Sequence, residues 1–295
     1  MNDIHIFAPA KINWALTIER KRPDGFHDIH TIFQALEWGD ELECRAADEP
    51  ACTIACNEPS VPTGPQNLVA RAWARLRGHY PDRVRGLDVN LIKRIPSGAG
   101  LGGGSSDAAA ALVAVDALYG LGLSGAQLEA HAAAIGSDCP YFLRGGTVLA
   151  SGRGERMKMI PNHLGPAWVV IVWPGFASPT AAAYGRVTPA DWENESAVME
   201  TARALELGDV IYLRKSMKNI FSKLVVSENM KYKMVVDAFV DVGISEPRLS
   251  GSGSAMFGLA RDEAHALSAS RSLAEIFPTA VATVLRQKGV EILPR

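Results

Sequence analysis

The chain has 295 residues, of which 47% are hydrophobic and 21% are charged. A chain of this length buries roughly three quarters of its unfolded surface, so its core needs neither disulfides nor metals for stability. The 30 lysines and arginines nearly balance the 32 aspartates and glutamates, which leaves a formal charge of −2. Because a balanced chain lacks the field that holds a polyanion, we expect no nucleic-acid partner.

No segment of the sequence has the pattern of a membrane anchor or a targeting signal. The longest apolar runs, residues 108–115 and 167–173, are far shorter than the ~20 residues of a membrane helix. The first eleven residues lack the basic start of a signal peptide. The cysteines form no Cys-x-x-Cys pair, which favours reduced thiols in a cytoplasmic protein without a membrane partner. They are Cys44, Cys52, Cys56 and Cys139.

The N-terminal third is rich in predicted strands. Residues 4–8, 12–18 and 87–95 are β-branched or alternate between apolar and polar side chains. The segment Arg22-Pro-Asp-Gly predicts a tight turn, because proline presets φ and Asp-Gly supplies a position with positive φ. Residues 67–78 have helical spacing and stop at a glycine, which predicts a helix.

Two helices are predicted in the middle of the chain. Residues 105–119 begin with serines, continue with an alanine-rich body and stop at Gly120. Residues 124–135 follow, with Ser124 and Gln127 at the spacing of a capping box.

The C-terminal half reads as a second structural unit. Residues 167–173 predict a buried strand that opens it, and residues 249–259 favour a glycine-rich hairpin. Helices are expected at residues 196–207, 210–225, 229–242 and 262–276. We place the boundary within residues 153–166, which gives an N-terminal domain of residues 1–160 and a C-terminal domain of residues 161–295.

The outstanding feature is a glycine-rich segment between a predicted strand and a predicted helix. Five glycines lie within the seven positions 98–104. The whole segment consists of Pro96, Ser97, Gly98, Ala99, Gly100, Leu101, Gly102, Gly103, Gly104, Ser105 and Ser106. Glycines let the main chain approach a ligand closely, and the following helix offers unsatisfied N–H groups to an anion. The serine hydroxyls can reach a phosphate or a phosphate-bound Mg²⁺. A flexible surface turn is the plain alternative.

Other phosphate loops fit this segment less well. It is not a Walker A loop, because no lysine follows the last glycine. Gly98, Gly100 and Gly103 satisfy the dinucleotide pattern G-x-G-x-x-G, yet the acidic residue expected after a second strand is missing and Asp116 falls inside the predicted helix. The sequence also lacks the HRD, DFG and VAIK motifs of protein kinases.

The segment resembles the phosphate loop of the GHMP small-molecule kinases, the superfamily of galactokinase, homoserine kinase and mevalonate kinase. Residues 249–255 resemble the C-terminal glycine motif of that superfamily. Three further segments, residues 8–13, 22–27 and 136–142, resemble one branch of it, whose small-molecule substrate carries a cytidine diphosphate. The resemblance covers about residues 8–258, nearly the whole chain.

Lys11 and Asp138 are the residues to which the resemblance gives catalytic roles. Without it, Lys11 could be a surface lysine and Asp138 a turn or capping aspartate. In the functional interpretation, a fixed ammonium stabilises developing negative charge. The carboxylate accepts the proton of the attacking hydroxyl or orients that hydroxyl.

Phe26 and His27 follow the predicted turn, where such a pair commonly anchors a loop by packing. The alternative is recognition of a flat heterocycle, with an aromatic face for stacking and an imidazole or nearby main chain for the edge. The resemblance implies that this segment holds the cytosine ring of the substrate. Tyr is commoner than Phe at this position in the family, so Phe26 keeps the stacking face and loses the hydroxyl.

The remaining assignments also follow from the resemblance. Asn13 would touch the substrate, Asn67 and Lys93 would line the adenosine pocket, and Thr180 and Tyr184 would close on the cytidine side. Ordinary turn or helix chemistry explains each of them equally well. After Asn219 the sequence departs from the family, which carries an acidic stretch there, so this segment receives no role. Residues 250–254 form either a tight hairpin or a second main-chain wall at the site.

The resemblance implies an α+β fold with two domains, a ribosomal-protein-like nucleotide domain and a ferredoxin-like C-terminal domain, with the active site between them. It also implies an ATP-dependent kinase that uses Mg²⁺ without a dedicated set of protein metal ligands. The oligomeric state does not follow from the sequence. Rival interpretations are a sister kinase for homoserine, mevalonate or a sugar, a dinucleotide-dependent oxidoreductase, and a catalytically silent nucleotide-binding module.

Overall fold

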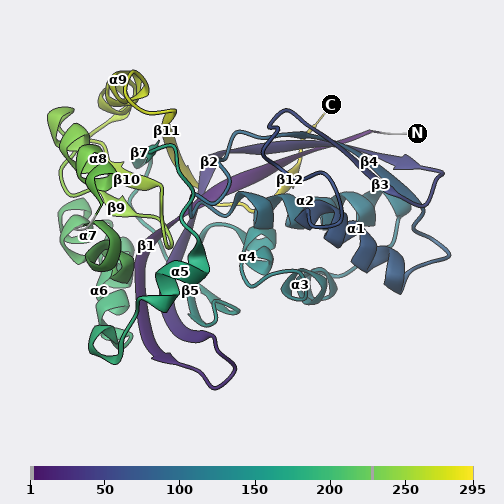
Figure 1. Ribbon diagram of the computed structural model, residues 1–295, viewed down its shortest axis with the longest axis horizontal. Helices are drawn as coiled ribbons and strands as arrows, with labels where there is room; N and C mark the ends of the chain where they lie inside the picture. The colour runs from purple at the N-terminus through teal and green to yellow at the C-terminus, as the bar shows by residue number, and fades with distance from the viewer. Residues whose placement is uncertain (1–2, 227–228, 295) are drawn as a thin grey trace.

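The computed structural model describes residues 3–226 and 229–294 of the chain. It is elongated and has a helical layer at each end of a continuous, branched sheet (Figure 1). The mixture of helices and antiparallel strands confirms the predicted α+β class. None of the helices in the described ranges has both the length and the apolar character to cross a membrane.

Two long strands connect the ends of the molecule. β1 (Ile4–Lys21) and β2 (His27–Ala47) form an antiparallel hairpin, and β2 also pairs with strands of both ends. The other strands are β3 (Cys52–Cys56), β4 (Gly86–Ile92), β5 (Thr147–Gly152), β6 (Arg156–Met159), β7 (Trp168–Trp173), β8 (Lys218–Asn219), β9 (Arg248–Leu249), β10 (Met256–Leu259), β11 (Thr279–Arg286) and β12 (Glu291–Ile292). The main path runs β12-β1-β2-β11-β7-β10-β9.

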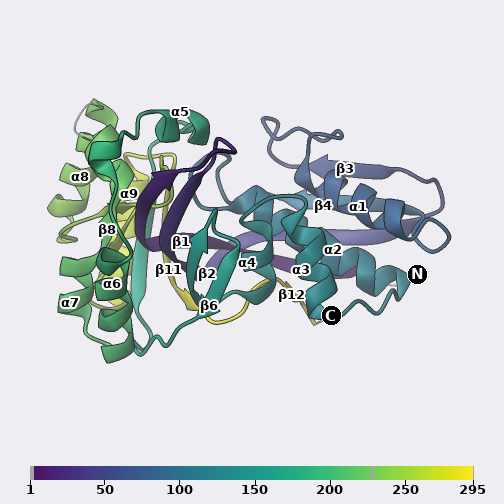
Figure 2. The same cartoon turned by 90° about the horizontal axis from the view of Figure 1, so that it is seen from below.

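The helices divide between the two ends of the sheet. Those near the N-terminus are α1 (Leu68–His79), α2 (Gly103–Tyr119), α3 (Gly125–Ala133) and α4 (Cys139–Arg144). The others are α5 (Thr180–Gly185), α6 (Ser196–Leu207), α7 (Val210–Ser216), α8 (Met230–Asp241) and α9 (Glu263–Ala274), with a 3₁₀ turn at Pro189–Asp191 and a π-helical turn at Ser222–Val226. Figure 2 shows the tip of the β1–β2 hairpin projecting on the side of α5.

Packing explains two features of the sequence, the alanine-rich composition of α2 and the uninterrupted apolar run of β7. The alanine-rich α2 is fully buried at Ala108, Ala110 and Ala111, and these small side chains let it lie close against β1 and β2. β7 is buried on both faces: Val169 and Ile171 pack in the core with α6 and α7, while Val170 and Val172 pack with α8 and α9. A strand covered on both faces reads as a continuous apolar run, as the sequence does here.

Several local predictions are confirmed and others are wrong. The helix expected at residues 67–78 is α1, although it continues past the predicted stop at Gly78; α3 has the capping box of Ser124 and Gln127, and residues 22–25 form the turn of the β1–β2 hairpin. The helix expected at 210–225 instead ends at Ser216 because the chain turns into β8, which pairs with β1. The strands expected at 4–8 and 12–18 are one strand, and the helix expected to start at residue 105 starts at Gly103. The boundary near residue 160 stays a prediction.

Candidate active site

The glycine-rich loop, residues 96–104, joins β4 to α2 and ends in an unusual helix start. Gly98, Gly100 and Gly102 have φ of 66°, 79° and 78°, which side chains with a Cβ rarely adopt. Gly102 is the N-cap of α2 in a left-handed conformation and provides no side-chain cap. The predicted serine cap is therefore wrong, because the serines lie inside the first turn. The first N–H groups of α2 are left for another partner.

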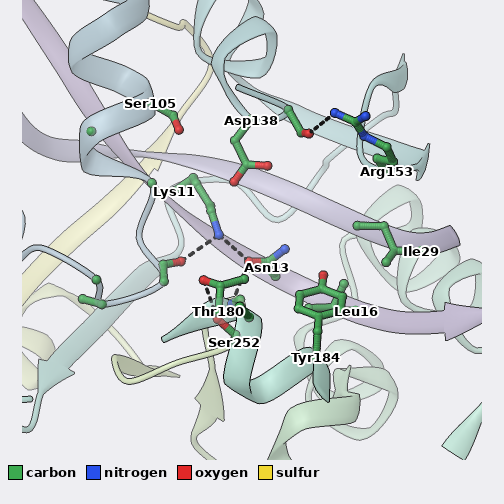
Figure 3. Close-up of a pocket in the computed structure, with 18 of the residues that line it drawn as sticks. Lys11, Asn13, Leu16, Ile29, Ser105, Asp138, Arg153, Thr180, Tyr184 and Ser252 are labelled. Atoms are coloured by element: carbon green, nitrogen blue, oxygen red, sulfur yellow. Dashed lines mark hydrogen bonds between the residues drawn. The ribbon is translucent and has the colours of Figure 1, made fainter. Parts of the chain in front are cut away.

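The loop lines a pocket of about 870 Å³. The opposite walls come from the β1–β2 hairpin, from the segment before α4 and from α5 (Figure 3). The predicted residues that line it are Lys11, Asn13, Phe26, His27, Lys93, Pro96, Ser97, Gly98, Ala99, Gly100, Gly102, Gly103, Gly104, Ser105, Asp138, Thr180 and Tyr184. Segments more than a hundred residues apart in the chain therefore share one cavity.

Lys11 lies on β1 and is only 4% exposed. Register shifts between Pro9 and Lys11, and again after Asn13, interrupt the pairing of β1 with β2, and such irregularities redirect side chains. The Lys11 ammonium donates hydrogen bonds of 2.7 Å to the side-chain oxygen Oδ1 of Asn13 and 2.7 Å to the main-chain carbonyl of Gly100. Burial lowers the pKa of Lys11 to about 8, and the negative charge of Asp138 opposes part of this change.

Asp138 occupies the N-cap position of α4, a short helix that was not predicted from the sequence. Its side chain makes no capping hydrogen bond, so the carboxylate is not engaged by its own helix. Figure 3 shows it reaching toward the space beside the Lys11 ammonium. Burial first, and then the charge of Asp138, raise the pKa of Tyr184. The carboxylate thus acts electrostatically on both Lys11 and Tyr184 across the pocket.

The second glycine-rich segment, residues 250–254, packs directly on the glycine-rich loop. The Ser250 hydroxyl donates to the Gly100 main-chain carbonyl at 2.9 Å, and the Gly251 N–H donates to the side-chain oxygen Oδ1 of Asn13 at 2.8 Å. A Cβ on Gly100 would lie 2.1 Å from the Ser250 carbonyl oxygen. The two alternatives left open by the sequence are both present: β9 and β10 pair as an antiparallel hairpin, and its turn, residues 250–254, forms a main-chain wall of the site.

Asn219 supports that wall from behind. It is 5% exposed, and its amide donates to the carbonyl oxygens of Leu249 at 2.9 Å and Gly251 at 2.8 Å. The neighbouring Phe221 is fully buried and packs edge-on against Tyr184, with ring centroids 4.9 Å apart. This segment, to which the sequence assigned no role, thus holds two parts of the pocket in place.

Lys93 reaches the loop from the other side, within a buried charge cluster. Its ammonium bonds to Asp40 and, at 2.8 Å, to Asp107. Burial alone would lower the pKa of Lys93, but the charges of Asp107 and Asp40 raise it. Burial raises the pKa of Asp107 to about 8, because one ammonium does not neutralise two buried carboxylates. Asp40 also accepts bonds from the Arg94 and Ile95 N–H groups, which fixes the entry to the loop.

Aromatic side chains gather at the far end of the pocket. The rings of His27 and Tyr184 lie 5.2 Å apart, and Phe26 is 50% exposed. Burial and the charge of Lys21 lower the pKa of His27. Thr180 lies at the start of α5, where its hydroxyl accepts a bond of 3.3 Å from Ser252.

Three predicted ligand residues do not line the pocket. Asn67 caps α1 and donates to the Pro62 carbonyl, Leu101 is 1% exposed, and the hydroxyl of the fully buried Ser106 has no hydrogen-bond partner among the described residues. The lining also includes residues that sequence reasoning missed, among them Lys21, Ser137 and Arg153. Ser137 adjoins Asp138 in the sequence, but no local signal identified Arg153.

Comparison with known proteins places this architecture in a class. A model of the GHMP kinases N terminal domain matches residues 67–146, and a model of the GHMP kinases C terminal matches residues 201–279. The chain belongs to the GHMP kinase family, enzymes that phosphorylate small molecules with ATP.

Individual relatives narrow the class. The 4-diphosphocytidyl-2-C-methyl-D-erythritol kinase of Geotalea daltonii is 34% identical over 92% of this chain and 95% of its own. That of Acaryochloris marina is 36% identical over 97% and 94%. A crystal structure of 4-(cytidine 5'-diphospho)-2C-methyl-D-erythritol kinase superposes with a TM-score of 0.80 at 33% identity, over 95% of this chain and 98% of that one. Homoserine kinase from Cytophaga hutchinsonii shares the fold at 19% identity, with a TM-score of 0.77 over 99% of this chain and 98% of that one.

Proposed function

We propose that this enzyme transfers the terminal phosphoryl group of ATP to the 2-hydroxyl of 4-diphosphocytidyl-2-C-methyl-D-erythritol, giving the 2-phosphate and ADP. The observation that carries the proposal is the meeting of Lys11, Asp138, the glycine-rich loop and an aromatic group in one pocket. Its relatives of similar length, named for this substrate, support the choice of acceptor.

In the proposed reaction, Asp138 and Lys11 divide the work. The Asp138 carboxylate accepts the proton of the 2-hydroxyl while the hydroxyl oxygen forms a bond to the γ-phosphorus. The bond between the γ-phosphorus and the bridging oxygen breaks, and ADP leaves. Lys11 stabilises the negative charge that develops on the transferred group. Because Asn13 and the Gly100 carbonyl hold the ammonium, it needs no reorganisation during the reaction.

Mg²⁺ accompanies ATP in this proposal. Among residues 3–226 and 229–294 no three His, Cys, Asp or Glu side chains cluster as metal ligands. Mg²⁺ does not need such a cluster, because it commonly binds through substrate phosphates, waters and one or two protein oxygens. The Ser105 hydroxyl in the first turn of α2 is the protein oxygen that would hold it. The ion supplies neutralisation of the phosphate charge.

The aromatic end of the pocket would take the cytosine. Phe26 offers a half-exposed ring, and His27 and Tyr184 form a tilted pair beside it. Stacking on such faces suits a flat heterocycle. We further propose that Asn13 and Thr180 contact this substrate, that Lys93 acts at the adenosine side together with Asn67, which lies behind the lining residue Leu68, and that the two units divide near residue 160. Free cysteines suit a reducing compartment such as the cytoplasm.

The direct test is ADP release by the purified protein with Mg-ATP and 4-diphosphocytidyl-2-C-methyl-D-erythritol. We expect stoichiometric formation of ADP and the 2-phosphate, identified by phosphorus NMR. Homoserine, mevalonate and galactose serve as competing acceptors, and we expect no turnover with any of them. ATP binding without turnover of the cytidine substrate would refute the proposed function.

A further inference from the structure

Arg153 is a cation of the pocket that the reaction described above does not use. It lies in the turn between β5 and β6, flanked by Gly152 and Gly154, whose φ values of 71° and 106° allow the chain to reverse there. Its guanidinium carbon lies 4.1 Å from the centroid of the Phe26 ring. One of its nitrogens donates a bond of 3.2 Å to the Ser137 hydroxyl (Figure 3).

Within residues 3–226 and 229–294, the direct contacts of the Arg153 guanidinium are with neutral groups, the Ser137 hydroxyl and the Phe26 ring, while Glu155 accepts a bond from the Arg153 main-chain N–H. In the described part of the chain, no carboxylate forms an ion pair with the guanidinium, and its hydrogen-bond acceptor Ser137 is neutral. The pKa of Asp24 is lowered chiefly by its hydrogen bonds from Arg22, and the charge of Arg153 contributes least to this shift. Lys93, by contrast, has two carboxylate partners. A cation without a carboxylate partner in a partly buried cavity favours an anionic ligand.

The two contacts of Arg153 also fix its position relative to the substrate. Ser137 directly precedes Asp138, where the reacting hydroxyl is proposed to lie, and Phe26 belongs to the proposed cytosine end. The guanidinium is therefore held between the two ends of the substrate. In a nucleoside diphosphate ester, the diphosphate connects the base-bearing sugar to the alcohol. The planar N–H fork of arginine matches phosphate oxygens and offers donors beyond the one that Ser137 uses.

We propose that Arg153 binds the diphosphate of the substrate and thereby selects nucleoside diphosphate esters over uncharged alcohols. The proposal rests on the proposed function and assigns a specificity-determining residue to it. Ser137 and Phe26 act as positioning residues, because they hold the guanidinium by a hydrogen bond and by a cation–π contact. Lys11 and the glycine-rich loop would serve the phosphates of ATP, so the pocket holds two separate anion sites.

The test compares the binding of CDP and cytidine by calorimetry, with the ATP site filled by a non-hydrolysable ATP analogue. The unmodified protein should bind CDP more tightly than cytidine. Arg153→Gln should weaken CDP binding by about 10- to 100-fold, the range for loss of hydrogen bonds to a charged group, and leave cytidine binding unchanged. The affinity of Arg153→Lys for CDP should lie between those of the unmodified protein and Arg153→Gln, because lysine keeps the charge and loses the planar fork.

Arg156→Gln is the matched control, since Arg156 is an exposed residue on β6 outside the pocket lining. It should leave both affinities unchanged. Equal weakening of CDP and cytidine in Arg153→Gln would mean that Arg153 only orders Phe26, and this would overturn the proposal. Retained preference for CDP in Arg153→Gln would overturn it as well. In either case, turnover of the cytidine substrate by the unmodified protein would leave the proposed function standing.

Discussion

Raising the pH should remove the charge of Lys11 and with it the activity of the free enzyme. Burial lowers the pKa of Lys11 from 10.5 to about 8, with Asp138 opposing the change. Lysine is charged when protonated, so the ammonium is present below this pKa and is lost as the pH rises through it. Because kcat/KM reports the ionisations of the free enzyme, it should fall about tenfold per pH unit above pH ~8.

The size of the effect follows from the same pKa. A decrease from 10.5 to about 8 corresponds to about 3 kcal/mol against the ammonium form. Asp138→Asn removes an attraction that favours this form, so the pKa of Lys11 should decrease further. The alkaline decline of kcat/KM should then begin at a lower pH. The same variant should lower kcat at least ~10²-fold at neutral pH, because the proton acceptor is lost, while ATP binding persists.

Bound phosphates should act in the opposite direction. Their negative charge lies beside the Lys11 ammonium in the proposed complex and raises its pKa. The decline of kcat, which reports the complex, should therefore begin at a higher pH than the decline of kcat/KM.

A coupled assay of ADP release, run between about pH 6 and 9.5, measures both profiles. Asp82→Asn provides the control, since Asp82 is exposed in the turn after α1 and lies outside the pocket lining. Its profiles should match those of the unmodified enzyme. An alkaline decline at the same or a higher pH in Asp138→Asn would refute the electrostatic coupling, and near-normal turnover would show Asp138 to be structural.

Three further substitutions test the supports of the pocket. Lys93→Met should reduce the free energy of unfolding by about 3–5 kcal/mol, because two buried carboxylates lose their cation, and adding Asp107→Asn should restore part of it in urea titrations. An unchanged midpoint would contradict this. Gly100→Ala should abolish ATP binding in calorimetry, since its Cβ would meet a backbone oxygen at 2.1 Å, whereas Gly122→Ala, at a similar φ in open space, should bind ATP normally. Phe26→Ala should raise the KM for the cytidine substrate about tenfold or more through lost stacking, and an equal rise in the KM for ATP would argue against a cytosine site.

Local features of this protein could be predicted because they depend on residues close in the sequence. The turn at residues 22–25 and the capping box at Ser124 each involve a few neighbouring residues. The anion-binding character of residues 96–106 also follows from composition, since glycines and a following helix expose N–H groups wherever they occur. The roles expected for Lys11 and Asp138, by contrast, came from resemblance to a family.

Elements that depend on distant partners were missed or wrong. The helix expected to continue past Ser216 gives way to β8, because Asn219 is drawn against β1 and the second glycine-rich segment. The start of α2 at Gly103 depends on a left-handed glycine packed against Phe142 and Lys11, which no serine pattern reveals.

By itself the sequence determined that a strand, a glycine-rich loop and a helix follow one another, because hydrogen bonds within a few residues define such elements. Only the tertiary structure decided that Lys11 is buried beside Gly100, that Lys93 is bound between Asp40 and Asp107, and that Arg153 lies over Phe26. These contacts set the pKa values and the free charges of the pocket. They depend on burial and on distances between residues far apart in the sequence, and neither can be read from local sequence patterns.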